Sequence, residues 1–264
     1  MSTAIIIPAR YGSSRLPGKP MLGILGLSML ERVWRIANAT TGCSRVVIST
    51  EDQRVVDHAK TFGAEAVLTP ESCRNGTERT FATIEAANIE ADAVINFQGD
   101  AVLTPPWVLQ SMIDEFEKAE GDFDLVTPAT KLTAEALEAL RESKKVNPAS
   151  GTTVVFDAKQ NALYFSKTIL PYFRSQGFAS VYRHIGLYGY RVPALKRYVS
   201  LPPSPLEQTE GLEQLRALEA GMTVRVVIVD YRGRTHASVD AAEDITIAEE
   251  IIRREGELVE GSKA

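Results

Sequence analysis

The chain has 264 residues, enough for one large domain or for one domain with an added lobe. Its apolar fraction of 44% and charged fraction of 24% are ordinary for a globular protein. A formal net charge of −5 argues against a nucleic-acid partner, because such proteins normally present a basic face. It leaves a nucleotide open, since a nucleotide needs only a local basic pocket.

Cysteine usage and apolar runs indicate the compartment. Cys43 and Cys73 lack metal-ligand spacing and are typical of a reduced protein. The N-terminal apolar run, residues 4–7, is too short for the core of a signal peptide. No stretch reaches the roughly 18 apolar residues that a membrane span needs. We expect a cytoplasmic protein without a membrane partner.

In the first half, short apolar runs alternate with helical patterns, which is typical of βα units and a largely parallel sheet. The predicted strands are 4–7, 46–49, 65–68 and 93–97. Four helices are predicted. The first follows a capping box at Ser28 and Glu31, and the second covers 53–62 with Gly63 as its C-terminal cap. The third runs from an N-cap at Thr77 to about 88, and the fourth from Pro106 to about 119.

The second half changes character. It predicts a hairpin of 152–157 with 162–166, a strand over 185–191, a helix opened by a capping box at Ser204 and closed by Gly221, a strand over 224–229, and a last helix from Asp240 to about 255.

The loop after the first strand collects cations. Residues 8–20 contain Arg10, Arg15 and Lys19, and the first acidic residue of the chain is Glu31. Gly12 and Gly18 let backbone N–H groups approach a ligand, and Ser13 and Ser14 add donors. A triphosphate needs such converging donors and charge neutralisation.

The loop has two alternative interpretations, a P-loop and a solvated basic loop. It is not a P-loop, because the spacing from Gly12 to Lys19 is one residue too long and Pro20 replaces the Ser or Thr that would hold magnesium. A solvated basic loop remains possible on local grounds. Ligands of open α/β sheets gather at the carboxyl ends of strands, which favours the phosphate interpretation.

Several segments, in the same order along the chain, resemble segments of the 3-deoxy-manno-octulosonate (Kdo) cytidylyltransferases, the CMP-Kdo synthetases. They are Ile7-Pro-Ala-Arg-Tyr-Gly-Ser-Ser-Arg-Leu-Pro-Gly-Lys-Pro20, Asn75-Gly-Thr-Glu-Arg79, Asn96-Phe-Gln-Gly-Asp100, Ala162-Leu-Tyr-Phe-Ser166, Arg183-His-Ile-Gly-Leu-Tyr-Gly-Tyr-Arg191, Pro203-Ser-Pro-Leu-Glu207 and Leu212-Glu-Gln-Leu-Arg216. The resemblance covers most of the chain.

The resemblance implies an α/β fold of the Rossmann-like nucleotide-diphospho-sugar transferase type, three layers around a mostly parallel mixed sheet with a small additional lobe. It implies one nucleotidyltransferase domain over 1–264. In this domain, residues 1–130 mainly bind the nucleotide and residues 131–230 mainly bind the sugar and form the dimer contact. Residues 231–264 return to the nucleotide half and supply a metal ligand and the C-terminal helix. The implied partners are CTP, a sugar acid and a second copy in a homodimer. The implied reaction is an in-line attack of the sugar's anomeric hydroxyl on the α-phosphorus, with pyrophosphate leaving, for lipopolysaccharide or capsule synthesis.

Two carboxylates are candidate Mg²⁺ ligands. Asp100 follows a predicted buried strand and the tight turn that Gly99 permits. Magnesium held by phosphate oxygens needs only one or two protein carboxylates. Asp240, three residues before Glu243, also has the spacing of a helix N-cap. The resemblance implies that Asp240 is the second metal ligand, and one residue could serve both roles.

The resemblance also assigns the remaining site residues. It implies catalytic roles for Arg10, Arg15, Lys19, Asp100 and Asp240, and nucleotide contacts by Ala9, Arg10, Gly12, Ser13, Ser14, Lys19, Ser49, Thr50, Gly76, Thr77 and Arg79. It implies that Gln98, His184, Tyr188, Glu213 and Gln214 bind the sugar acid. His184 and Tyr188, four apart, would share one face of a strand. Without the family, His184 reads equally well as structural, and Glu213 and Gln214 read as solvated helix positions.

Some positions depart from the family pattern. They are Glu51 in place of an aspartate, Ala101 and Val102 in place of Glu-Pro, Thr152 in place of a lysine, and residues 235–238 in place of a glycine-rich approach to the final aspartate. These departures leave the sugar open among Kdo, an amino-substituted Kdo and a sialic-type acid. A catalytically silent nucleotide-binding homologue is the rival from another class.

Overall fold

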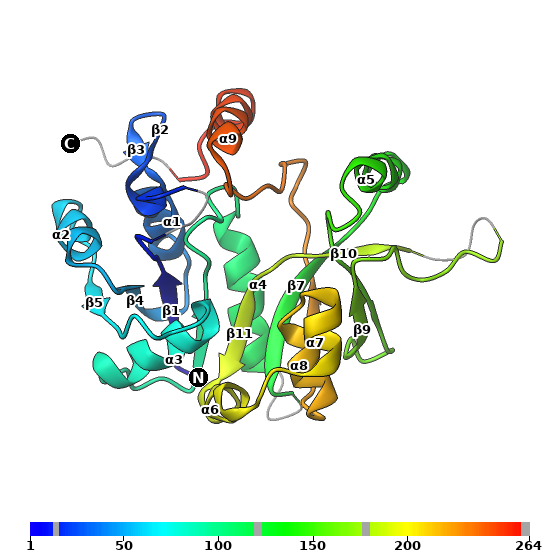
Figure 1. Ribbon diagram of the computed structural model, residues 1–264, viewed down its shortest axis with the longest axis horizontal. Coiled ribbons are helices and arrows are strands. Elements are labelled where there is room, and N and C mark those ends of the chain that lie inside the picture. Colours follow the sequence, from blue (N-terminus) through cyan, green and yellow to red (C-terminus); the bar gives the residue numbers. More distant parts are fainter. Residues whose placement is uncertain (13–15, 119–122, 176–179, 260–264) are drawn as a thin grey trace. The chain divides into compact units, whose positions relative to one another are not determined.

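Figure 1 shows the computed structural model, which describes residues 1–12, 16–118, 123–175 and 180–259. The chain divides into two compact units, one of Met1–Asp114 with Tyr231–Ala264 and one of Glu115–Asp230. The first boundary falls inside helix α4 (Pro106–Lys118), earlier than residue 130, where the sequence predicted the nucleotide half to end. The C-terminal segment from Tyr231 onward belongs to the first unit.

The first unit contains four parallel strands in the order β5-β4-β1-β6. They are β1 (Thr3–Pro8), β4 (Cys43–Thr50), β5 (Ala66–Leu68) and β6 (Ala93–Asn96). All six residues of β1 are buried, as expected of a central parallel strand that is covered on both faces and therefore reads as a continuous apolar run. The four predicted strands of this half are confirmed.

Helices cover this sheet and are held by local caps. They are α1 (Met29–Asn38), α2 (Gln53–Thr61), α3 (Gly76–Ala86) and α9 (Ala242–Glu255), with a short helix η1 (Lys19–Met21) and a small hairpin of β2 (Gly23–Ile24) and β3 (Leu27–Ser28). The Ser28 side chain accepts from the N–H of Glu31 at 3.1 Å, as the capping box predicted. Gly63 adopts a φ of +76° after α2, as its predicted role at the helix end requires.

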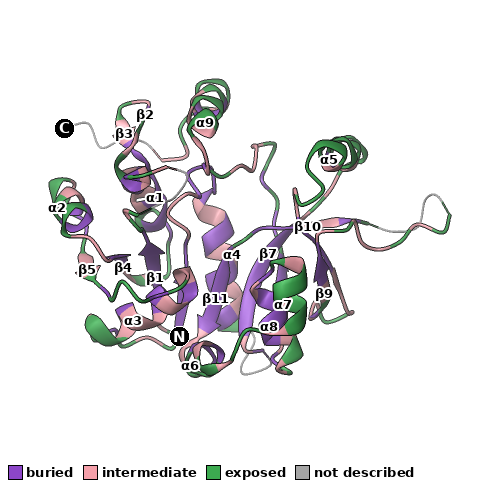
Figure 2. Cartoon of the chain, viewed as in Figure 1, coloured by how far each residue is buried: buried purple, intermediate pink, exposed green. Residues whose placement is uncertain are grey.

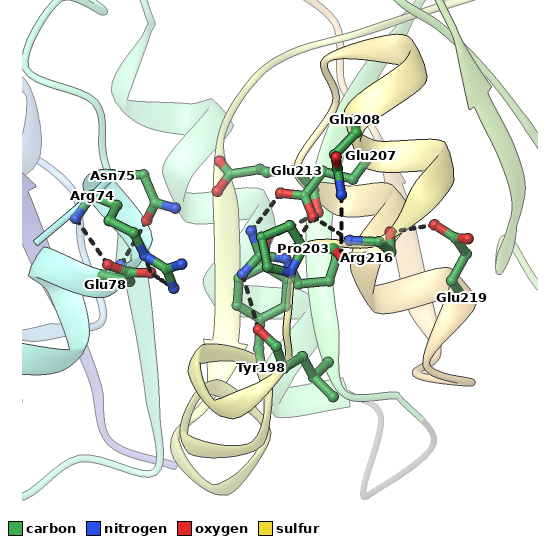
Figure 3. Close-up of polar contacts among 12 residues, drawn as sticks. Arg74, Asn75, Glu78, Tyr198, Pro203, Glu207, Gln208, Glu213, Arg216 and Glu219 are labelled. Carbon is green, nitrogen blue, oxygen red and sulfur yellow. Dashed lines mark hydrogen bonds and ion pairs between the residues drawn. The ribbon is translucent and has the colours of Figure 1, made fainter.

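Two predicted N-caps are wrong. Asn75, not Thr77, caps α3, because its side chain accepts from the N–H of Glu78 at 2.9 Å (Figure 3). Thr77 lies inside the first turn, where its hydroxyl accepts from Asn96. Asp240 does not cap α9, because the carboxylate of Asp244 takes the N–H groups at the start of that helix.

The second unit is built around β7 (Leu125–Lys131). Strands β10 (Tyr182–His184) and β11 (Tyr188–Arg191) pair with it antiparallel, and β12 (Val224–Ile228) pairs with it parallel. Beyond β10 lies the predicted hairpin, β8 (Thr153–Phe156) with β9 (Ala162–Ser166). Its helices are α5 (Ala134–Val146), α6 (Val192–Ser200), α7 (Pro205–Glu210) and α8 (Gln214–Glu219), of which the first two were not predicted.

Two elements of this unit are interrupted where the sequence predicted continuity. The strand predicted over 185–191 begins only at Tyr188, because residues 185–187 form a break between β10 and β11, where the Thr127 hydroxyl donates to the Leu187 carbonyl at 2.7 Å. The shift in pairing follows Pro128 in β7, which has no N–H for the ladder. The helix predicted from Ser204 to Gly221 breaks at Gly211, whose φ of +64° ends α7.

Figure 2 shows the strand β1 buried and the outward faces of α2 and α5 exposed. In α5, Leu140 is the buried residue. Within the described part of the chain, no helix combines the length and the apolar character that a bilayer span demands.

Candidate functional site

A cavity of about 250 Å³ opens in the first unit at the carboxyl ends of β1 and β6. Its lining consists of Pro8, Ala9, Arg10, Lys19, Pro20, Asn75, Gly76, Arg79, Gln98, Gly99, Asp100 and Asp240. The segments that follow two neighbouring parallel strands therefore meet the N-terminus of α3 and the segment before α9. This is the edge at which ligands of open α/β sheets bind.

Two glycines allow the walls of this cavity to approach one another. A Cβ at Gly99 would lie 2.9 Å from the backbone oxygen of Pro8, closer than carbon and oxygen can pack. A Cβ at Gly76 would lie 3.2 Å from the amide of Gln98 and from the ring of Pro8. The turn that carries Asp100 can therefore lie against the end of β1 only because residue 99 has no side chain.

Lys19 and the two candidate metal ligands form one cluster. The Lys19 Nζ lies 2.9 Å from Asp100 Oδ2 and 3.5 Å from Asp240 Oδ1. Asp100 and Asp240 are 140 residues apart in sequence but both contact the same ammonium group. The sequence suggested an opening loop without a compensating anion; the structure supplies two.

Asp240 is held in place from several directions. Val239, which is fully buried, donates its N–H to the Asp100 carbonyl at 3.2 Å. The Ser238 hydroxyl donates to Asp240 Oδ2 at 3.1 Å. Because Asp244 serves the start of α9, the Asp240 carboxylate does not serve as the helix cap and lies toward Lys19 instead.

This donor set fits a hard cation. Both carboxylates already contact a positive charge, and carboxylate oxygens are the ligands that Mg²⁺ prefers. Within the described residues, no cluster of three or more His, Cys, Asp or Glu side chains has metal-binding geometry. The protein thus offers two carboxylates, and phosphate oxygens and water would complete an octahedral shell.

The opening loop is tied to the strand beside it through Glu51. This carboxylate accepts from the N–H groups of Tyr11 at 3.0 Å and Gly12 at 3.4 Å. Its other oxygen lies 3.2 Å from Arg79, a guanidinium that is 1% exposed yet lines the cavity. Glu51 therefore links three segments of the site, and it occupies the position where the sequence departs from the family's aspartate.

Some of the predicted nucleotide contacts line the cavity and others do not. Ala9, Arg10, Lys19, Gly76 and Arg79 line the cavity. Ser49, Thr50 and Thr77 are fully buried and do not line it; the Ser49 hydroxyl, for example, contacts those of Thr69 and Thr83. The Gly12 N–H is directed at Glu51. Ser13, Ser14 and Arg15 lie outside the described residues.

In the second unit, two of the predicted sugar contacts form a buried pair. The Tyr188 hydroxyl donates to Gln214 Oε1 at 2.8 Å, and the side chains are 5% and 1% exposed. Gln214 is therefore not the solvated helix residue that its pattern alone suggests. Its Nε2 is buried and has no acceptor among the described residues, a state that is uncommon for a buried donor.

His184 and Glu213 lie near this pair. His184 Nε2 forms a 2.8 Å hydrogen bond with the Thr127 hydroxyl, and its ring lies 5.7 Å from that of Tyr188. These two residues belong to different strands, so the prediction that they share a face of one strand is wrong. The Glu213 carbonyl accepts from the Tyr198 hydroxyl at 3.0 Å (Figure 3). Burial, together with the charge of Glu213, raises the pKa of Tyr188 well above its ordinary value.

Comparison with known proteins identifies the family. A model described as cytidylyltransferase matches residues 4–224. The chain belongs to the cytidylyltransferase family. The resemblance seen in the sequence is thereby confirmed, and so is cytidylyltransferase activity as the enzyme class.

Among curated relatives of this cytidylyltransferase, the 3-deoxy-manno-octulosonate cytidylyltransferase of Maricaulis maris is 51% identical, over 98% of this chain and 100% of the relative. An 8-amino-3,8-dideoxy-manno-octulosonate cytidylyltransferase of Shewanella pealeana is 37% identical, over 94% and 98% of the two chains.

A solved structure of a CMP:2-keto-3-deoxy-manno-octonic acid synthetase in complex with CTP matches with a TM-score of 0.86 and 33% identity, over 97% of this chain and 100% of that one. The inositol-1-phosphate CTP transferase of T. maritima shares the fold, with a TM-score of 0.64 and 17% identity. The predicted α/β class with a mixed sheet is therefore confirmed.

Sequence reasoning missed several residues of this site. Asn75 and Pro20 line the cavity, Glu51 ties its walls together, and Ser238 contacts Asp240. Glu51 could have been found by the rule that identified Asp100, because it also stands directly after a buried parallel strand. No local pattern indicates Ser238.

Proposed function

We infer that this protein transfers CMP from CTP to the anomeric hydroxyl of 3-deoxy-D-manno-octulosonate, giving CMP-Kdo and pyrophosphate. The observation that carries the chemistry is the convergence of Asp100 and Asp240 on one cation, beside a cavity that Arg10 also lines. The choice of sugar follows the relative that is 51% identical along its whole length.

The reaction is a substitution at phosphorus. The anomeric hydroxyl gives up its proton to solvent and its oxygen forms a bond to the α-phosphorus of CTP, while the bond to the bridging oxygen breaks and pyrophosphate carries away the electron pair. Arg10 and Lys19 hold the β- and γ-phosphates and offset their charge, which grows as pyrophosphate leaves. Arg79, held by Glu51, adds a third positive charge to the lining.

Magnesium is the cofactor that we propose, with Asp100 and Asp240 as its protein ligands. A bound ion would supply Lewis-acid polarisation of the phosphate and would favour ionisation of the attacking hydroxyl. Asp240 is oriented for this by Ser238 and by the backbone bond from Val239 to Asp100. No side chain then needs to act as a strong base.

Recognition of the sugar acid is assigned to Gln214 and Tyr188 of the second unit. The unpaired Gln214 Nε2 donates to a sugar oxygen, and Tyr188 holds the amide in that orientation. Tyr188 is the donor in this pair, through its hydroxyl. A site built of such groups rejects analogues that lack the matching hydroxyl.

The setting of the reaction is also proposed from the family. We propose a cytoplasmic homodimer that supplies CMP-Kdo to lipopolysaccharide or capsule synthesis. The two free cysteines, Cys43 and Cys73, are compatible with a reducing compartment.

The decisive assay measures pyrophosphate release from each of the four nucleoside triphosphates with Kdo, 8-amino-Kdo and a sialic acid. The proposal predicts the highest kcat/KM for CTP with Kdo. A preference for 8-amino-Kdo would assign the chain to the specificity of its 37% identical relative. CTP binding without pyrophosphate release from any acid would refute the enzymatic function.

A further inference from the structure

Asp244 lies four residues after Asp240, in the first turn of α9. Its Oδ2 accepts hydrogen bonds from the backbone N–H groups of both Asp240 and Ala241, each at 2.8 Å. We propose that Asp244 is a positioning residue for the transfer reaction, which fixes the backbone of Asp240 so that its carboxylate stays beside Asp100. The inference rests on the proposed function, because the position of the Asp240 carboxylate matters only if Asp240 is a metal ligand.

The backbone around Asp240 is held on both sides. On the N-terminal side, Val239 donates to the Asp100 carbonyl at 3.2 Å. The two bonds to Asp244 then fix the peptide groups immediately before and after the Asp240 Cα. Rotation of the Asp240 backbone, which would swing its carboxylate away from Asp100, therefore requires breaking one of these anchors.

An ordinary capping role would explain part of this geometry. The first N–H groups of a helix lack intrahelical partners, and a carboxylate in the first turn is favoured by the helix dipole. One of the two bonds, however, goes to Asp240, which lies before α9 begins at Ala242. Loss of Asp244 therefore frees the proposed metal ligand itself as well as the helix end.

The neighbouring Glu243 provides a matched control. It carries the same charge in the same helical turn but is exposed. Replacing either acid by alanine removes one negative charge from the start of α9. Only the change at Asp244 removes the acceptor for the Asp240 N–H.

The expected effect is on metal dependence. Outer partners of metal ligands typically contribute about 10- to 100-fold in metal affinity. We expect about a tenfold increase in the Mg²⁺ concentration that half-saturates pyrophosphate release for Asp244→Ala, with the KM for CTP at saturating Mg²⁺ within about twofold of wild type. Asp244→Asn, whose amide oxygen can still accept both bonds, should restore most of the affinity.

The experiment compares Asp244→Ala, Asp244→Asn and Glu243→Ala with the wild type. Mg²⁺ titrations of turnover are paired with Mn²⁺ binding to the protein–CTP complex, measured from the EPR signal of free Mn²⁺, and with amide exchange at Asp240 and Ala241. Equal shifts for Asp244→Ala and Glu243→Ala, or no shift for either, would overturn the proposal. If Asp244→Ala does not fold, Asp244→Glu keeps the charge but displaces the acceptor, and the same shift is expected.

A parallel Asp100→Asn variant separates this inference from the proposed function. If Asp100→Asn binds Mn²⁺ as the wild type does, the metal assignment itself is wrong. If Asp100→Asn loses the metal while Asp244→Ala keeps wild-type affinity, the metal assignment stands and the positioning role of Asp244 is wrong.

Discussion

The buried pair of Tyr188 and Gln214 should lower the free energy of unfolding of the protein while contributing to binding of the sugar acid. In the present structure the pair makes one buried hydrogen bond and leaves Gln214 Nε2 without an acceptor among the described residues. A buried hydrogen bond stabilises by about 1 kcal/mol, whereas an unpaired buried donor costs about 1–3 kcal/mol. The double variant Tyr188→Phe with Gln214→Met removes both terms, so it should be as stable as the wild type or up to about 2 kcal/mol more stable.

The single variants are expected to fall in a defined order. Tyr188→Phe leaves both atoms of the Gln214 amide unpaired and should be the least stable, by about 1–3 kcal/mol. Gln214→Met removes the unpaired donor but leaves the Tyr188 hydroxyl without its acceptor. These two effects oppose each other, so the stability of this variant should stay near that of the wild type. The double variant should exceed Tyr188→Phe, although it carries one more substitution.

Urea unfolding and steady-state kinetics test this order together. The midpoint of unfolding reports the stability difference when the slope is unchanged. Loss of the amide donor should raise the KM for the sugar acid by about tenfold, which corresponds to about 1.4 kcal/mol, and leave the KM for CTP unchanged. A double variant less stable than Tyr188→Phe, or one with a wild-type KM for the sugar acid, would refute the reasoning.

Four further outcomes are expected. Asp100→Asn should fold normally by circular dichroism yet lose at least about 100-fold in kcat, and retention of near-full activity would count against the metal role. Gly99→Ala should lower the free energy of unfolding by about 1–3 kcal/mol, because its Cβ meets the Pro8 carbonyl, whereas Gly23→Ala, with open space around it, should not. Glu51→Gln should raise the KM for CTP and destabilise the protein by about 1–3 kcal/mol, since Arg79 loses its charged partner, which kinetics and urea titration would detect. Because the pKa of Tyr188 is raised in the folded state, its contribution to stability is complete below the pKa of the unfolded chain and is lost as pH rises through it; unfolding titrations above about pH 10 should therefore fall more steeply for the wild type than for Tyr188→Phe.

The sequence by itself determined most of the elements of the first unit. Its apolar runs marked the four parallel strands, and Ser28 with Glu31 marked the start of α1, because an apolar run and a capping box are both patterns of residues close together in the sequence. The collection of cations after β1 and the acid after β6 also indicated the site, since parallel strands end at one edge of a sheet.

The tertiary structure decided what depends on distant partners. It also resolved local alternatives that the sequence leaves open: Asn75 rather than Thr77 caps α3, and Asp244 rather than Asp240 accepts from the N–H groups at the start of α9. It divided the strand at 185–187 because Pro128 lies opposite. It brought Glu51 to Arg79 and Asp240 to Asp100, contacts between residues far apart in sequence that no local periodicity encodes.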